Sequence, residues 1–203
     1  MPALRTTAFA LAFCAVAALS AAADGERLTN QQKAEAFLAR LAESNADPEL
    51  LAKLQAAWKE AQEGGYADDF LGEALIHASA DYRAALDLFE QDQFALAAAA
   101  FEKVAEGAKD PYVQAGATYQ AAACHVKCDA FDKAKPLFVK TSSDLAPYTQ
   151  WEAESVFWLA HCHAFLLERD EAIATLGRFL TDYADAKERF RITAGQFKDQ
   201  LAY

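Results

Sequence analysis

Residues 92–97 read Asp-Gln-Phe-Ala-Leu-Ala, and residues 129–134 read Asp-Ala-Phe-Asp-Lys-Ala. In both segments a phenylalanine follows four residues after the closing alanine. A third, more divergent copy begins at Glu168 and places its alanine at Ala172. The three alanines, Ala97, Ala134 and Ala172, thus recur at an almost constant spacing. Self-similarity at such a period predicts stacked helical hairpins, because one hairpin cannot bury its apolar stripe alone.

The segments that precede the three copies favour helices, and they supply the first helix of each expected hairpin. These segments are residues 78–91, 115–128 and 153–167. Two more helices are expected within residues 28–63, the second capped by Asp47 with Pro48 at its first position. Gly64 and Gly65 should end that helix.

The composition points to the same fold class. Alanine, the strongest helix former, supplies 49 of the 203 residues, whereas valine and isoleucine together supply nine. Because sheets draw heavily on β-branched residues, these counts predict an all-α protein. The formal net charge is −11, which disfavours binding to nucleic acid or to anionic lipid surfaces.

The first residues are typical of an export signal. One base, Arg5, precedes an apolar run over residues 8–19, and a small-residue exit ends at Ala23. We therefore expect a signal peptide over residues 1–23, cleaved after Ala23, with an acylated Cys14 or an uncleaved anchor as alternatives. No later apolar run is long enough to span a bilayer, so the mature chain is not expected to insert into a membrane. It should be periplasmic or secreted.

The repeats resemble those of the tetratricopeptide repeat family. The resemblance covers residues 78–184 and is carried by a small residue early in each second helix, with an apolar residue four positions later. No copy keeps the family's first-helix glycine, and the period exceeds the usual one of about 34 residues. The stretch over residues 170–183 is similar to repeats of secreted bacterial cell-envelope proteins.

The resemblance implies an α-solenoid. Its expected parts are a helical N-terminal segment over residues 24–66, three hairpins over 67–184 and a capping helix over 185–203. In the family, the first helix of each hairpin lines a concave groove that binds peptides. The residues expected on that face, headed by an aromatic ladder at one repeat position, are Tyr82, Tyr119 and Phe157, with Leu86, Phe89, Val126, His161 and Phe165 beside them.

Cysteine and histidine also recur in register. Cys124-His125 and Cys162-His163 occupy the same position in successive copies, with Cys128 near the first pair. Cys and His together could bind a metal ion or form a disulfide such as Cys128–Cys162. Helical geometry favours core packing instead, because His125 and His163 fall on the buried stripe and the two cysteines at its edge.

No hydrolase, metalloprotease or phosphate-binding motif is present, so we expect neither an enzyme nor a cofactor. The predicted function is binding of another protein or peptide in the bacterial cell envelope. Two alternatives remain open at this stage. One is a metal- or redox-active module built on the cysteines and histidines, and the other is a self-associating structural protein that forms a homo-oligomer.

Overall fold

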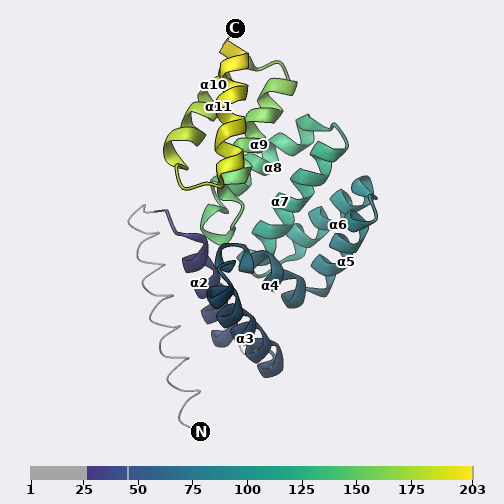
Figure 1. Ribbon diagram of the computed structural model, residues 1–203. Coiled ribbons are helices and arrows are strands. Elements are labelled where there is room, and N and C mark those ends of the chain that lie inside the picture. Colours follow the sequence, from purple (N-terminus) through teal and green to yellow (C-terminus); the bar gives the residue numbers. More distant parts are fainter. Residues whose placement is uncertain (1–26, 45, 203) are drawn as a thin grey trace. The chain divides into compact units, whose positions relative to one another are not determined.

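The computed structural model describes residues 27–44 and 46–202, and the predicted signal peptide therefore lies outside the described residues. Ten α-helices and two short 3₁₀ helices occur in this part of the chain, with no strand, so the prediction of an all-helical protein is confirmed (Figure 1). The elements, in chain order, are α2 (Asn30–Glu43), α3 (Pro48–Gly64), η1 (Ala67–Asp69), α4 (Phe70–Ala78), α5 (Ala80–Glu90), α6 (Phe94–Gly107), α7 (Pro111–Lys127), α8 (Phe131–Ser142), η2 (Ala146–Tyr148), α9 (Glu152–Phe165), α10 (Arg169–Asp182) and α11 (Glu188–Ala202).

Local sequence sets several helix boundaries. Thr29 and Gln32 form a reciprocal capping box at the start of α2. Asp47 accepts a hydrogen bond at the start of α3, with Pro48 in the first turn as predicted. Gly65 ends α3 at φ 77°, a conformation that suits glycine. Asp110 caps α7 in the same way as Asp47 caps α3, so α7 begins earlier than expected from the sequence.

The chain divides into two compact units, and the first contains α2, α3, η1 and α4 together with Pro147–Gln150. Two polar contacts hold this inserted segment. The ammonium of Lys33, which is only 1% exposed, donates to the Thr149 carbonyl at 3.0 Å. The side chain of Gln150 accepts from the backbone N–H of Gly72 at 2.9 Å, in the first turn of α4. The first unit extends to Arg83, beyond the expected boundary at residue 66.

The second unit contains helices α6 to α11 and the end of α5. Each helix from α6 to α11 packs against the next one along the chain. The three register alanines, Ala97, Ala134 and Ala172, are fully buried, as the repeat pattern requires. The apolar residues four positions later are fully buried as well: Phe101, Phe138 and Leu176. Small residues at these positions let neighbouring helix backbones approach closely.

Three helix-to-helix turns share one backbone conformation. Asp92, Asp129 and Leu167 have φ values of 58°, 55° and 63°, the only non-glycine positive values in the described residues. In each turn the following amide donates to a carbonyl five residues back, as the bonds Gln93 to Leu88, Ala130 to His125 and Glu168 to His163 show. This pattern defines a Schellman motif. The turns recur with the same spacing as the sequence copies.

Candidate functional site

The aromatic ladder expected from the sequence does not form an exposed surface. The prediction that these rings are exposed is wrong for two of the three. Tyr82 is 1% exposed and Phe157 is 3% exposed. Each lies three residues before a buried alanine, Ala85 or Ala160, and three residues make slightly less than one full helical turn. An aromatic ring at that position is therefore close in angle to the buried alanine, at the edge of the core rather than opposite to it.

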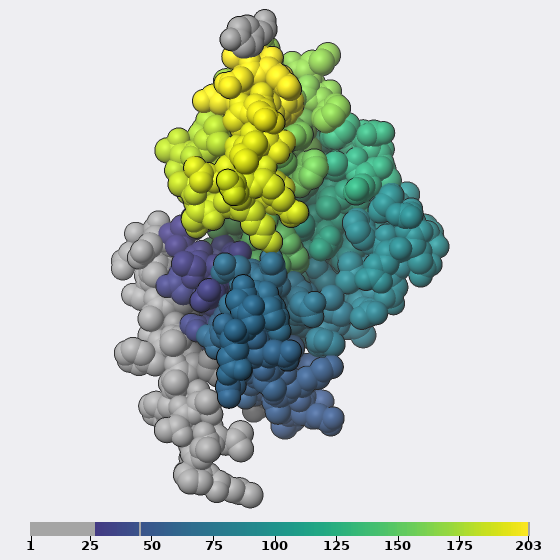
Figure 2. All heavy atoms as spheres, viewed as in Figure 1, coloured from purple at the N-terminus to yellow at the C-terminus, as the bar shows by residue number. Residues whose placement is uncertain are grey.

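Helix α11 supplies much of the cover over Phe157. The Phe157 ring lies 5.1 Å from that of Phe190 in α11 and 5.8 Å from that of Phe179 in α10. Atoms of α11, in yellow, form the surface over α9 and α10 on the face that Figure 2 shows, in agreement with the packing of α11 on both helices. The C-terminal helix, expected as a cap, thus covers Phe157, the third aromatic residue of the expected groove.

His161 is partly buried by the same helix, although the repeat register places it on the solvent side. Its ring stacks on Phe197 of α11 at 4.5 Å, and its Nδ1 lies 3.0 Å from the Phe157 carbonyl. Burial lowers the pKa of His161, partly offset by that hydrogen bond, because the charged imidazolium loses hydration. His161 is therefore a packing residue of the α9–α11 contact.

The remaining candidates form no continuous exposed surface. Tyr119 is half-buried and stacks on Trp151 at 4.9 Å with nearly parallel planes. Leu86, Phe89 and Val126 are also half-buried. Phe165 alone among the expected groove residues is exposed, at 61%.

The cysteines of the repeat register belong to the core, as predicted. Cys124 and Cys162 have no exposed surface, and burial raises the pKa of each thiol to about 12. Cys128 is exposed, and all three are free thiols rather than a disulfide. No group of three or more His, Cys, Asp or Glu side chains in the described part of the chain is arranged to hold a metal ion.

Thiol reactivity should follow this burial. Labelling the native protein with iodoacetamide should modify Cys128 first, because a buried thiol with a pKa of about 12 carries almost no thiolate near neutral pH. Peptide mapping by mass spectrometry measures the labelled fraction at each cysteine. In urea, all three should react at similar rates. Fast native labelling of Cys124 or Cys162 would contradict the core assignment.

The two histidines of the register each contact a glutamate, which the sequence pattern did not reveal. His125 Nε2 lies 2.7 Å from a carboxylate oxygen of Glu102 in α6. His163 Nδ1 lies 2.6 Å from Glu168, which directly follows the third turn. The partners come from different repeat positions, so no periodic signal in the sequence could have identified them.

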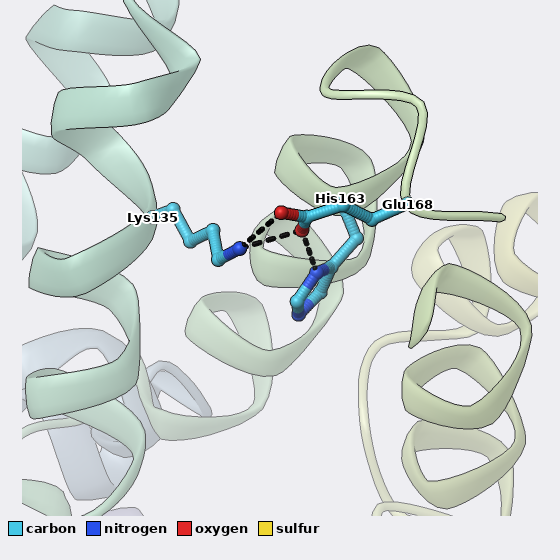
Figure 3. Close-up of polar contacts among 3 residues, drawn as sticks. All are labelled: Lys135, His163 and Glu168. Carbon is cyan, nitrogen blue, oxygen red and sulfur yellow. Dashed lines mark hydrogen bonds and ion pairs between the residues drawn. The ribbon is translucent and has the colours of Figure 1, made fainter. Parts of the chain in front are cut away.

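Glu168 forms a clamp with Lys135 and His163, drawn in Figure 3. The Lys135 ammonium, from α8, lies 2.6 and 2.5 Å from the two carboxylate oxygens of Glu168. These contacts lower the pKa of Glu168, the hydrogen bond from Lys135 contributing most and that from His163 next. The clamp joins α8, α9 and the start of α10 at the third turn.

Loss of this clamp should contribute to acid unfolding. Because the folded-state pKa of Glu168 is below its ordinary value of 4.5, its stabilising contribution is present above that pH. The contribution is lost as pH falls through the lowered pKa. Glu168→Gln should therefore reduce stability at neutral pH and flatten the loss between neutral and acid pH, as measured by urea unfolding at several pH values. An unchanged pH profile would contradict this role.

An exposed apolar patch lies at the same turn. Leu167 is 91% exposed, and the Phe165 ring stacks on Phe131 at 4.2 Å with planes 4° apart. We call the four residues Phe131, Phe165, Leu166 and Leu167 the third-turn patch. The sequence placed Leu167 in the preceding helix, and only its left-handed backbone conformation brings it to the surface of a turn.

Comparison of the chain with known protein families, with curated proteins and with solved structures finds no match in any of the three. None of the described helices has both the length and the hydropathy that crossing a membrane requires.

Proposed function

We propose that this chain is a non-enzymatic helical-repeat protein that binds another protein or peptide in the bacterial cell envelope. Its architecture would be an α-solenoid of three hairpins, α5–α6, α7–α8 and α9–α10, with helical segments at both ends. The observation that carries the proposal is the recurrence of one Schellman turn at Asp92, Asp129 and Leu167, in register with buried alanines. Stacked hairpins of this kind expose extended surfaces suited to protein recognition.

The export signal expected over residues 1–23 supports the envelope location. The acidic charge of −11 favours a partner with basic character, since it steers association with positively charged surfaces. Because Tyr82 and Phe157 are core residues, the binding surface would lie on exposed positions instead of the expected ladder.

The proposal is tested by affinity capture with the protein purified from the envelope of an expressing bacterium. We expect a discrete partner to be retained, to saturate at a fixed ratio and to be displaced by untagged protein. An unrelated exported protein of similar charge is the matched control. Retention equal to that control would contradict the proposal, and concentration-dependent self-association in sedimentation would favour the structural alternative.

A further inference from the structure

The third Schellman turn differs from the first two in its side chain. Asp92 and Asp129 occupy the left-handed position of the first two turns, and aspartate tolerates that conformation because its short polar side chain bonds locally. Leu167 occupies the same position at φ 63°, where a leucine is sterically unfavourable. Its side chain is also 91% exposed, so packing within the described chain does not compensate for the strain.

The ring contact beside this turn is also less polar than the equivalent contact in the preceding repeat. In the preceding repeat, the ammonium of Lys127 lies 5.9 Å from the centre of the Phe94 ring, so a charge covers that aromatic. The equivalent contact at the third turn joins Phe131 to Phe165, which is 61% exposed. Phe165 and Leu167 thus occupy the positions at which the preceding repeat has the charged residues Lys127 and Asp129.

The clamp of Glu168 with Lys135 and His163 anchors the residue next to this surface. Glu168, the residue after Leu167, is bonded to Lys135 of α8 and to His163 of α9. A surface held in its binding conformation loses less conformational entropy when a partner docks. The bonds of Glu168 therefore restrict the backbone next to the patch.

The charged groups around the patch define the partner. The exposed acids on the flanking turns are Asp129, Asp132, Asp170 and Glu171. Of the nearby bases, Lys135 pairs with the carboxylate of Glu168. Lys127 and Arg169 contact uncharged groups, the Phe94 ring and the Leu201 carbonyl, and therefore keep their positive charges. Lys133 is a further exposed base on these described turns. The four exposed acids thus outnumber the three exposed bases, Lys127, Lys133 and Arg169, by one around the apolar centre.

Resting on the proposed function, we propose that the third-turn patch docks a protein segment that presents apolar side chains flanked by lysine or arginine. Leu167 and Phe165 would be the apolar anchors, and the surrounding acids would orient the basic flanks. A second copy of this chain fits less well, because it would bring the same acids together at a net charge of −11 per chain.

The test uses defined amphipathic peptides of about 18 residues, long enough for about five helical turns. One is built from Leu and Lys, one from Leu and Glu, and one from Gln and Lys. We expect the Leu/Lys peptide to bind tightest in fluorescence anisotropy. Leu167→Asn should weaken that binding at least about tenfold, without lowering the melting temperature, because asparagine tolerates the left-handed conformation.

The matched control is Leu96→Gln, which removes another exposed leucine, on α6, and should change affinity by less than about twofold. Replacing Asp129, Asp132 and Asp170 together with Asn should reduce the salt dependence of binding. Equal affinities for Leu167→Asn and the unmodified protein would overturn the proposal. So would self-association that Leu167→Asn abolishes, since the occupant would then be a second copy.

The two proposals fail in distinguishable ways. If the envelope partner is captured equally by the unmodified protein and by Leu167→Asn, the patch is not its docking site, while the proposed function stands. If neither protein captures a partner and no basic apolar peptide binds, both proposals are overturned.

Discussion

Replacing Phe157 with alanine should lower the free energy of unfolding by about 3–5 kcal/mol, the range for removing a buried aromatic ring. The Phe157 ring contacts rings from α10 and α11 and is 3% exposed, so its loss leaves a cavity at the meeting point of three helices. Against a total stability of about 5–15 kcal/mol, such a change is severe. Urea unfolding followed by circular dichroism measures it.

The matched control is Phe165→Ala, on the same helix. Because Phe165 is 61% exposed and stacks on one ring, its removal should cost no more than about 1 kcal/mol. Equal stability of the two variants would contradict the burial of Phe157. It would favour the original prediction that Phe157 lies in an exposed groove.

Replacing Lys33 with alanine should destabilise the first unit by about 2–4 kcal/mol, comparable to deleting a long buried side chain. The Lys33 side chain is 1% exposed and its ammonium donates to Thr149, which is distant along the chain. Removing it leaves a cavity and takes a donor from a buried carbonyl. Urea unfolding of the variant should show the loss, and hydrogen exchange should show faster opening of α2.

Lys59→Ala provides the comparison, since the Lys59 side chain is 77% exposed and its ion pair with Glu63 lies on one helix surface. That change should alter stability by less than about 0.5 kcal/mol. Equal effects of the two substitutions would contradict the role of Lys33 as a buried tie between α2 and the segment over residues 147–150.

Features that depend on neighbouring residues could be predicted from the sequence. Asp47 and Pro48 specify a helix start through local hydrogen bonding and a fixed φ, and both act as expected. The alanine and phenylalanine repeat specifies which face of each second helix is buried, and Ala134 and Phe138 are buried accordingly. The packing of Cys124 and Cys162 followed from helical angles alone.

Features that depend on distant segments could not be predicted. An aromatic residue at the edge of a helical stripe can face a neighbour or solvent, and Phe157 faces the core because α11 lies over it. Likewise, nothing local to Gln150 indicates that it caps α4, far earlier in the chain. Leu167 was missed because residue preferences assign leucine to helix interiors, whereas a left-handed turn position favours glycine, asparagine or aspartate.

Hydrogen exchange of the protein with and without its captured partner tests the central claim most directly, namely that recognition occurs at the exposed third turn rather than along the first helices. The account predicts that the partner slows exchange of the amides over residues 128–132 and 165–169. Protection confined to the faces of α5, α7 and α9 that carry Tyr82, Tyr119 and Phe157, with none at the third turn, would contradict it.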